Sequence, residues 1–175
     1  ALPELDARSI PSTMFVPTEW AERSAREPSD DGSPVPMTPD ELAALPASVE
    51  LASHSCTHAH LPQLDDDSLA DELVRSRHDL EHMTGRPVRY HAFPYGEHDA
   101  RVDRAAQRAG YERCYGIVPT ETRPSDGFVV GRVQVDPTDW RVEFRLKLLG
   151  AYRWMGWWMR AKDRMRSRPS NGAIA

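Results

Sequence analysis

The sequence predicts an α/β fold with mainly parallel strands. Short apolar runs typical of buried strands alternate along the chain with longer segments that have helical periodicity. Polar, histidine-rich residues follow directly after one of these runs, where loops of α/β folds carry their chemistry. With 175 residues, the chain has the size of one ordinary domain.

Five segments have the composition of strands, and helical segments separate most of them. The strand segments are 10–16, 49–53, 88–93, 113–118 and 128–135. They are rich in Val, Phe and Tyr, which favour extended backbone. Strands that alternate with helices are expected to pair in parallel.

Helices are predicted at four places, with a longer helical region towards the end of the chain. The segments are 2–8, 39–47, 65–85, 99–111 and a region from about residue 139. Thr38 and Glu41 form a capping box at the start of the second segment. Gly85 is expected to end the third. Residues 22–39 are rich in Pro, Ser and Asp and are predicted to form a surface loop.

Charge is distributed unevenly. The net charge is −5, yet residues 141–168 carry nine Lys or Arg against two acidic residues. The acidic remainder argues against nucleic acid as a partner, because nucleic acid requires a basic surface on the folded domain. No secretory signal is visible, and a location at the cell envelope or in the cytoplasm of a bacterium stays open.

The C-terminal region has its own composition. Residues 1–152 are predicted to form the folded domain, and residues 153–175 a basic, aromatic-rich helix with a disordered end. Residues 153–168 either pack on the domain or form a peripheral contact with anionic lipid or glycan. The sequence does not indicate an oligomeric state.

The stretch LASHSCTHAHL, residues 51–61, contains three histidines and a cysteine. His54 and His58 are four residues apart, so a helical turn would bring both imidazoles to one divalent ion. A catalytic site also requires a third protein ligand, often a carboxylate. On these residues alone, a metal site and a histidine-rich polar loop remain alternatives. His78 and His82 have the same spacing, but they lie on a charged helix and are interpreted as solvated surface.

Further segments accompany this stretch in a characteristic order. They are IPSTMFVPT before it, and GRPVRYHAFPYGEHD, AGY, GRVQVD and FRLKLLGAYRW after it. Together they resemble the polysaccharide deacetylases of the NodB-homology type, in particular bacterial exopolysaccharide-associated members, from residue 1 to about 155. The resemblance implies a distorted (β/α) barrel with a divalent metal, commonly zinc, bound by one Asp and two His. It also implies a polysaccharide substrate from which N-acetyl or O-acetyl groups are removed.

The resemblance implies roles for individual residues. His54 and His58 match the two metal-binding histidines of the H-[ST]-x-x-H motif, and Ser55 matches the hydroxyl residue that braces this loop. The segment FPYG matches a motif that lines the active-site groove, and its members are Phe93, Pro94, Tyr95 and Gly96. The backbone N–H of Tyr95 would help to bind the oxyanion that forms when water attacks the acetyl carbonyl.

Two departures from the family pattern concern side chains within the chain. Ala92 stands where many members have an arginine that steadies the catalytic base. The late Leu-x-His motif, which supplies the general acid in many members, is not found. Arg132 and His91 are considered as substitutes, although His91 has the alternative of a strand residue that faces a packed core.

A third departure concerns the paired aspartates that supply the catalytic base and the third metal ligand. They should precede the first helix, and the chain begins inside that helix. We therefore expect an N-terminally truncated domain that lacks its first strand and is inactive by itself. The favoured interpretation is a metal-dependent deacetylase that acts on N-acetyl rather than O-acetyl groups. The alternatives are a catalytically inactive carbohydrate-binding remnant and, less favoured, an oxygenase-type site completed by Asp65 or Asp66.

Overall fold

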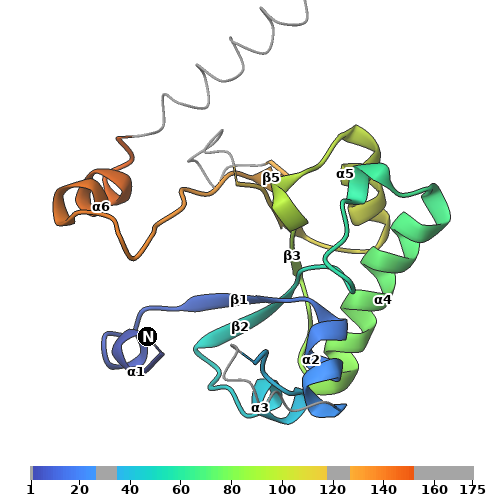
Figure 1. The fold of residues 1–175 in the computed structure, drawn as a ribbon, viewed down its shortest axis with the longest axis horizontal. Coiled ribbons are helices and arrows are strands. Elements are labelled where there is room, and N and C mark those ends of the chain that lie inside the picture. The colour runs from blue at the N-terminus through green and yellow to red at the C-terminus, as the bar shows by residue number, and fades with distance from the viewer. Residues whose placement is uncertain (1, 27–34, 118–126, 152–175) are drawn as a thin grey trace, which may run out of the picture. The chain divides into compact units, whose positions relative to one another are not determined.

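The computed structural model describes residues 2–26, 35–117 and 127–151 (Figure 1). The chain divides into two compact units, Ala1–Tyr115 and Gly116–Ala175. The first unit contains the sheet, the histidine-rich stretch and the FPYG segment.

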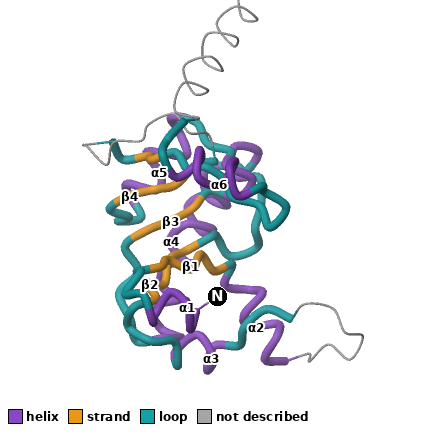
Figure 2. Tube along the Cα trace, turned by 90° about the vertical axis from the view of Figure 1, so that its left-hand side faces the viewer, coloured by secondary structure: helices purple, strands orange, loops and turns teal. Residues whose placement is uncertain are grey.

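Parallel strands form the sheet of the first unit in the order β1-β2-β3-β4. Figure 2 shows these strands in orange. The strands are β1 (Ser12–Val16), β2 (Val49–Ser53), β3 (Tyr90–Ala92) and β4 (Arg113–Tyr115). Strands β1 and β2 pair along their full length, from Ser12 opposite Val49 to Val16 opposite Ser53. The predicted strands of this unit and their parallel pairing are confirmed, although β3 and β4 are shorter than predicted.

Helices and short 3-10 turns connect these strands. The helices are α1 (Leu2–Ala7), α2 (Thr18–Arg26), α3 (Pro39–Ala43), α4 (Asp66–Thr84) and α5 (Ala100–Arg108), and the turns are η1 (Leu61–Gln63) and η2 (Pro94–Gly96). The predicted capping box of Thr38 and Glu41 is present at the start of α3. Gly85 ends α4 with a left-handed φ of 66°, as predicted. Helix α3 ends at Ala43, a few residues earlier than expected, because Pro46 cannot continue a helix.

The prediction of a loop over residues 22–39 is wrong at its beginning, because α2 continues to Arg26. The helix starts after Pro17 and buries Ala21 and Ser24, which are three residues apart and therefore share one face. Burial of this face outweighs the polar composition of the segment. A short helix of this kind is stabilised by tertiary packing rather than by propensity.

The core lies between α4 and the sheet. The buried residues of α4 are Leu69, Glu72, Leu73, Ser76 and Leu80. Leu51 of β2 is buried on the face that also carries Ser53, whose hydroxyl lies against Ser76 of α4, whereas Ala52 and Ala92 are buried on the opposite face of the sheet. Both cysteines, Cys56 and Cys114, are buried free thiols, and burial raises the pKa of each.

The second unit is described from Gly116 to Ile117 and from residue 127 to 151. It contains β5 (Val129–Val130) and α6 (Arg141–Leu148). The strand predicted over 128–135 is thus confirmed only at its start, and the helical region predicted from about residue 139 is confirmed as α6. The predicted helix over 153–175 lies outside the described residues. Within the described ranges, no helix combines the length and the apolar character that a membrane crossing requires.

Candidate active site

The candidate site lies at the carboxyl ends of the parallel strands. The histidine loop, defined here as residues 54–60, begins where β2 ends, and η2 follows closely on β3. Parallel neighbouring strands end at the same edge of a sheet, so these two segments meet there. The N–H of His54 donates to the carbonyl of Val16 at 3.0 Å, which attaches the start of the loop to the end of β1.

His54 and His58 lie close together, but not through the helical turn expected from their spacing, because the loop between them is non-helical and Ser55 and His58 have left-handed backbone. Their ring centroids are 4.7 Å apart, with the ring planes at 79°. Nδ1 of His54 lies 2.7 Å from the carbonyl oxygen of Ala92. Because that oxygen can only accept, Nδ1 of His54 carries a proton and donates it to the Ala92 carbonyl. A carbonyl partner of this kind commonly orients metal-binding histidines, so the pair fits as two ligands of a divalent ion.

Carboxylates that could complete a metal site are engaged elsewhere. Asp65 accepts from the N–H of Ser68 at 2.7 Å as the N-cap of α4, and Asp66 pairs with Arg101 at 2.7 Å. In the part of the chain that the structure describes, no group of three His, Cys, Asp or Glu side chains is placed to hold an ion. The oxygenase-type site that Asp65 or Asp66 would complete finds no support in this arrangement.

Left-handed backbone is concentrated at this site. Non-glycine residues with positive φ include Ser55 at 67°, His58 at 66° and Tyr95 at 57°, and among the described residues only Ser9 joins them. This conformation costs a non-glycine residue about 1 to 2 kcal/mol. It persists only where the surroundings hold it in place, which occurs most often at functional sites.

Glu72, in the middle of α4, holds the histidine loop. Its Oε2 accepts from the backbone N–H groups of Cys56 at 2.8 Å and of Thr57 at 3.2 Å, and its Oε1 accepts from the Thr57 hydroxyl at 2.7 Å. Glu72 is only 8% exposed. The sequence analysis did not identify this residue, although a glutamate on the same helical face as Leu69 and Leu73 was a signal that it has a buried partner.

The contacts of Ser55 run through its backbone. Its N–H donates to Oγ of Ser53 at 3.3 Å, and its carbonyl accepts from the N–H of Thr18 at 3.2 Å. Its own hydroxyl is buried, and no hydrogen-bond partner is found for it among the described residues. The bracing role expected for this hydroxyl stays a prediction.

The FPYG segment forms a rigid turn. Phe93 and Pro94 are buried, and the N–H of Gly96 donates to the carbonyl of Phe93 at 2.9 Å. Tyr95 is 50% exposed, and its left-handed φ turns the backbone sharply between the two anchored residues. A backbone N–H that stabilises an oxyanion must be preorganised, and the buried neighbours of Tyr95 hold this turn in place. The oxyanion role of Tyr95 itself stays a prediction.

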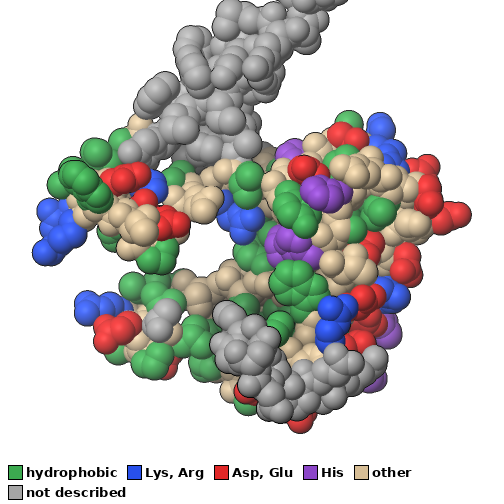
Figure 3. Space-filling view, viewed as in Figure 1, with side chains coloured by type: hydrophobic (Ala, Val, Ile, Leu, Met, Phe, Trp, Pro, Cys, Tyr) green, Lys and Arg blue, Asp and Glu red, His purple; other side chains and the backbone are tan. Residues whose placement is uncertain are grey.

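Aromatic side chains surround the histidine pair. The ring of His58 lies 5.3 Å from Trp20 and 4.7 Å from Tyr95, measured between centroids. His60 stacks on Tyr95 at 4.1 Å, and its Nδ1 lies 2.7 Å from Oε2 of Glu97. On this face of the first unit, histidine side chains lie next to hydrophobic ones (Figure 3). Trp20 was not among the site residues predicted from the sequence.

His91 belongs to a buried polar network beneath the site. Oγ of Ser53 lies 3.1 Å from Nδ1 of His91 and 2.9 Å from Oγ of Ser76, which in turn lies 3.2 Å from the hydroxyl of Tyr111. Burial, with a smaller contribution from nearby His54, lowers the pKa of His91 to about 3. His91 is therefore a neutral residue that faces the core, which was the alternative interpretation, and not a proton donor in the groove.

Arg132 lies in the second unit, where its Nε donates to the carbonyl of Gly116 at 3.1 Å. It lines a cavity of about 260 Å³ together with Ile117, Val133 and Gln134. Its role as a substitute for the missing general acid stays a prediction.

Comparison with solved structures shows the fold. The Streptococcus pyogenes deacetylase PplD, solved in complex with acetate, is 18% identical with a TM-score of 0.70, and the match covers 83% of this chain and 62% of that one. A de-N-acetylase from Aggregatibacter actinomycetemcomitans is 18% identical with a TM-score of 0.68, covering 82% and 67%. The BpsB deacetylase domain of Bordetella bronchiseptica is 25% identical with a TM-score of 0.63, covering 77% and 64%. The chain thus spans less than two thirds of the length of PplD.

Comparison with sequences identifies the family. No curated protein matches the chain significantly. The profile of the family described as polysaccharide deacetylase matches residues 1–114, which include β1 to β3, the histidine loop and the FPYG turn. This chain, with its parallel α/β fold of the NodB type, belongs to the polysaccharide deacetylase family.

Proposed function

We propose that the protein performs metal-dependent removal of acetyl groups, N-acetyl in preference to O-acetyl, from a polysaccharide. The observation that supports this proposal is the His54–His58 pair, whose ring centroids lie 4.7 Å apart and in which Nδ1 of His54 donates to the Ala92 carbonyl. Neutral imidazole is a common ligand of zinc, which is the first candidate among divalent ions. When bound, such an ion polarises the acetyl carbonyl and lowers the pKa of a coordinated water.

The residues of the chain would supply orientation and charge stabilisation. The Glu72 carboxylate fixes the loop that carries His58, and the Ala92 carbonyl fixes the proton on His54. The N–H of Tyr95, presented by the η2 turn, would donate to the oxyanion as the acetyl carbon becomes tetrahedral. One donor of this kind typically lowers the activation barrier by about 3 kcal/mol.

A catalytic metal site takes three protein ligands, and a deacetylase requires a base for the attacking water. Among the described residues, His54 and His58 would provide two ligands, and the nearby carboxylates of Glu72 and Glu97 are occupied by the histidine loop and by His60. We therefore expect the chain alone to bind metal weakly and to be inactive. The same observation favours one second candidate, a carbohydrate-binding protein of this fold without catalytic activity.

Zinc titration with acetate-release measurements tests both candidates. The substrate is penta-N-acetylchitopentaose, and the variants are His54→Ala and His58→Ala. The matched control is the double variant His78→Ala/His82→Ala, whose rings lie 6.4 Å apart on α4 with the same sequence spacing. The proposal expects zinc binding to be lost in the first two variants and retained in the control. Zinc binding that disappears only in the control would refute the metal site. Zinc and glycan binding without acetate release, in the full-length native protein, would favour the second candidate.

A further inference from the structure

Trp20 lies beside the histidine pair and contacts the ring of His58. It lies in the first turn of α2, and its indole contacts this ring at 5.3 Å with an interplanar angle of 31°. Tyr95 contacts the same histidine at 4.7 Å. Trp20, His58 and Tyr95 therefore form a continuous row of rings at the carboxyl edge of the sheet, and His60 extends it by stacking on Tyr95 at 4.1 Å.

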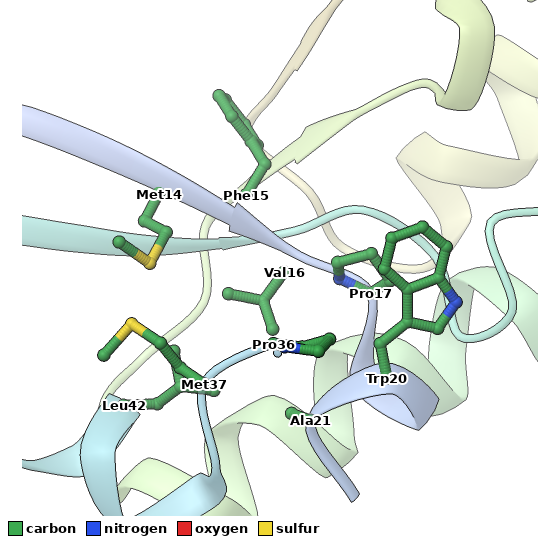
Figure 4. Close-up of a pocket in the computed structure, with 9 residues that line it drawn as sticks. All are labelled: Met14, Phe15, Val16, Pro17, Trp20, Ala21, Pro36, Met37 and Leu42. Atoms are coloured by element: carbon green, nitrogen blue, oxygen red, sulfur yellow. The ribbon is translucent and has the colours of Figure 1, made fainter. Parts of the chain in front are cut away.

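The indole is not required to fill the core. Trp20 is 41% exposed, whereas Val16 and Ala21 beside it are 6% and 1% exposed. A cavity of about 140 Å³ separates β1 from α2 and α3, and Figure 4 shows Trp20 beside Pro17 at one end of it, away from Met37 and Leu42. An exposed indole next to the histidine pair offers a ligand an apolar, aromatic face that binding would remove from water.

The backbone around Trp20 is held rigidly against the histidine loop. The N–H groups of Thr18 and Glu19 donate to the carbonyls of Ser55 at 3.2 Å and Cys56 at 3.1 Å. The first turn of α2 therefore takes its hydrogen-bond partners from the loop that carries His58. A tryptophan has only two side-chain torsions, so little conformational entropy is lost when it binds a ligand.

The carboxylate of Glu19 adds a second connection. It accepts from Nη2 of Arg75 at 2.7 Å, and Nε of Arg75 lies 3.3 Å from Sγ of Cys56. Arg75 of α4 thus connects α2 and the histidine loop. The backbone that carries Trp20 is therefore held in a fixed position relative to the loop that carries His58.

We propose that Trp20 is a sugar-binding residue, whose indole face stacks on a pyranose unit next to the acetylated unit held at His58. A pyranose with equatorial substituents, as in glucosamine polymers, presents axial C–H groups on its faces. The negative face of an aromatic ring attracts such C–H groups, and the contact also buries apolar area. Trp20 would thereby select glycans of this configuration and position the chain along the row of rings. This inference rests on the proposed function and adds a binding residue to it.

Binding of penta-N-acetylchitopentaose, measured by isothermal titration calorimetry on the full chain, tests the inference. The variants are Trp20→Phe, which keeps a flat ring, and Trp20→Leu, which keeps apolar bulk without a ring. Trp140→Leu is the matched control, since Trp140 is 80% exposed and belongs to the second unit. Stacking predicts about tenfold weaker binding for Trp20→Leu, a smaller loss for Trp20→Phe and no change for Trp140→Leu.

The outcomes separate this inference from the proposed function. If the unsubstituted protein binds the oligomer and both Trp20 variants bind it equally well, the inference is wrong while the proposed function stands. Equal losses in Trp20→Phe and Trp20→Leu, with a lowered melting temperature in both, would indicate a structural role and also overturn it. If the unsubstituted protein does not bind penta-N-acetylchitopentaose, both proposals fail together for N-acetylglucosamine polymers.

Discussion

At the scale of single residues, the shape of the histidine loop depends on the carboxylate of Glu72, which lies on α4. Glu72 accepts hydrogen bonds from two backbone N–H groups and one hydroxyl, all within residues 56 and 57. A buried N–H without a partner costs about 1 to 3 kcal/mol, and two of them depend on this one side chain. Glu72 thereby fixes the two residues that precede His58, which itself has left-handed backbone.

Replacing Glu72 with Ala should lower the free energy of unfolding by about 3 kcal/mol, because both loop N–H groups lose their acceptor. Affinity for zinc should fall about 10- to 100-fold, the range found when residues that orient metal ligands are removed. Urea unfolding and calorimetry measure the two effects. Asp71→Ala is the control, since its carboxylate lies on the same helix and is 61% exposed. Equal losses in the two variants would contradict the role of Glu72.

His91 should make stability depend on pH. Burial lowers its pKa from 6.5 to about 3, so between these values the unfolded chain binds a proton that the folded chain does not. The free energy of unfolding should thus be constant above pH 6.5 and fall as the pH is lowered, by about 2 kcal/mol at pH 5. Urea unfolding at pH 7 and pH 5 measures this change.

The variant His91→Gln provides the comparison, since every other titratable group is kept. Its free energy of unfolding should depend less on pH than that of the unsubstituted protein, by the same amount of about 2 kcal/mol between pH 6.5 and pH 5. Measurements stay above pH 5 because the lowered pKa values of Asp65 and Asp99 matter only in stronger acid. Identical pH dependence in the two proteins would show that His91 is not the group responsible.

The residues that the sequence analysis missed share a physical reason. Spacing identifies His54 and His58 as partners because they are close in the chain, and motif order identifies the FPYG turn. Glu72 and Trp20 act on the same loop from α4 and α2, and only the folded structure brings them to it. Periodicity predicts that position 72 faces inward, but it does not say which backbone groups will be there.

At the scale of elements, local sequence signals predicted the capped helix ends better than the lengths of the helices and strands. The capping box of α3 and the glycine at the end of α4 lie where expected, because caps are decided by neighbouring residues. The length of β3 and the existence of α2 depend on packing, which propensity does not contain. Helix α2 is the clearest case, since its polar sequence forms a helix against residues of the histidine loop.

Gly110 and Gly85 provide a matched test of helix ends. Both have left-handed backbone, with φ of 85° and 66°. A Cβ at Gly110 would lie 2.2 Å from Nη1 of Arg77, which donates to the carbonyl of Ala109, whereas a Cβ at Gly85 would meet nothing within 4 Å. Gly85→Ala should lower the free energy of unfolding by about 1 kcal/mol through backbone strain alone. Gly110→Ala should lower it by about 2 kcal/mol, because the Arg77 side chain must also move.

Urea unfolding of both variants measures the difference. The double variant Arg77→Ala/Gly110→Ala isolates its cause, because the substitution of Gly110 should cost about 1 kcal/mol once the guanidinium is absent. A cost of Gly110→Ala that is independent of Arg77, or equal to that of Gly85→Ala, would contradict this explanation. The AGY segment of the sequence would then owe its glycine to φ alone.

At the scale of the molecule, the hydrogen bonds described for the histidine loop lie within the first unit. They run to β1, α2, α4, β3 and Glu97, all within Ala1–Tyr115. The family profile covers residues 1–114, nearly the same range. The domain boundary predicted from composition lies instead between residues 152 and 153. Composition reflects charge and aromatic content, whereas the two units are defined by their contacts. The fold class was predictable because caps, strand runs and motif order agree with one another.

A fragment of residues 1–115 should therefore retain the zinc affinity of the whole chain within about threefold, since no named contact of the histidine pair is removed. Calorimetric titration of the fragment, the whole chain and the fragment with His54→Ala/His58→Ala measures this. Cooperative unfolding of the fragment is the accompanying check. If the fragment binds zinc no better than its double variant, then residues after Tyr115 support the histidine pair. The other outcome is that the fragment binds zinc as well as the whole chain does. If deletion of residues 116–175 from an active protein then abolishes acetate release, the second unit contributes to catalysis, and Arg132 is the first residue of that unit to substitute.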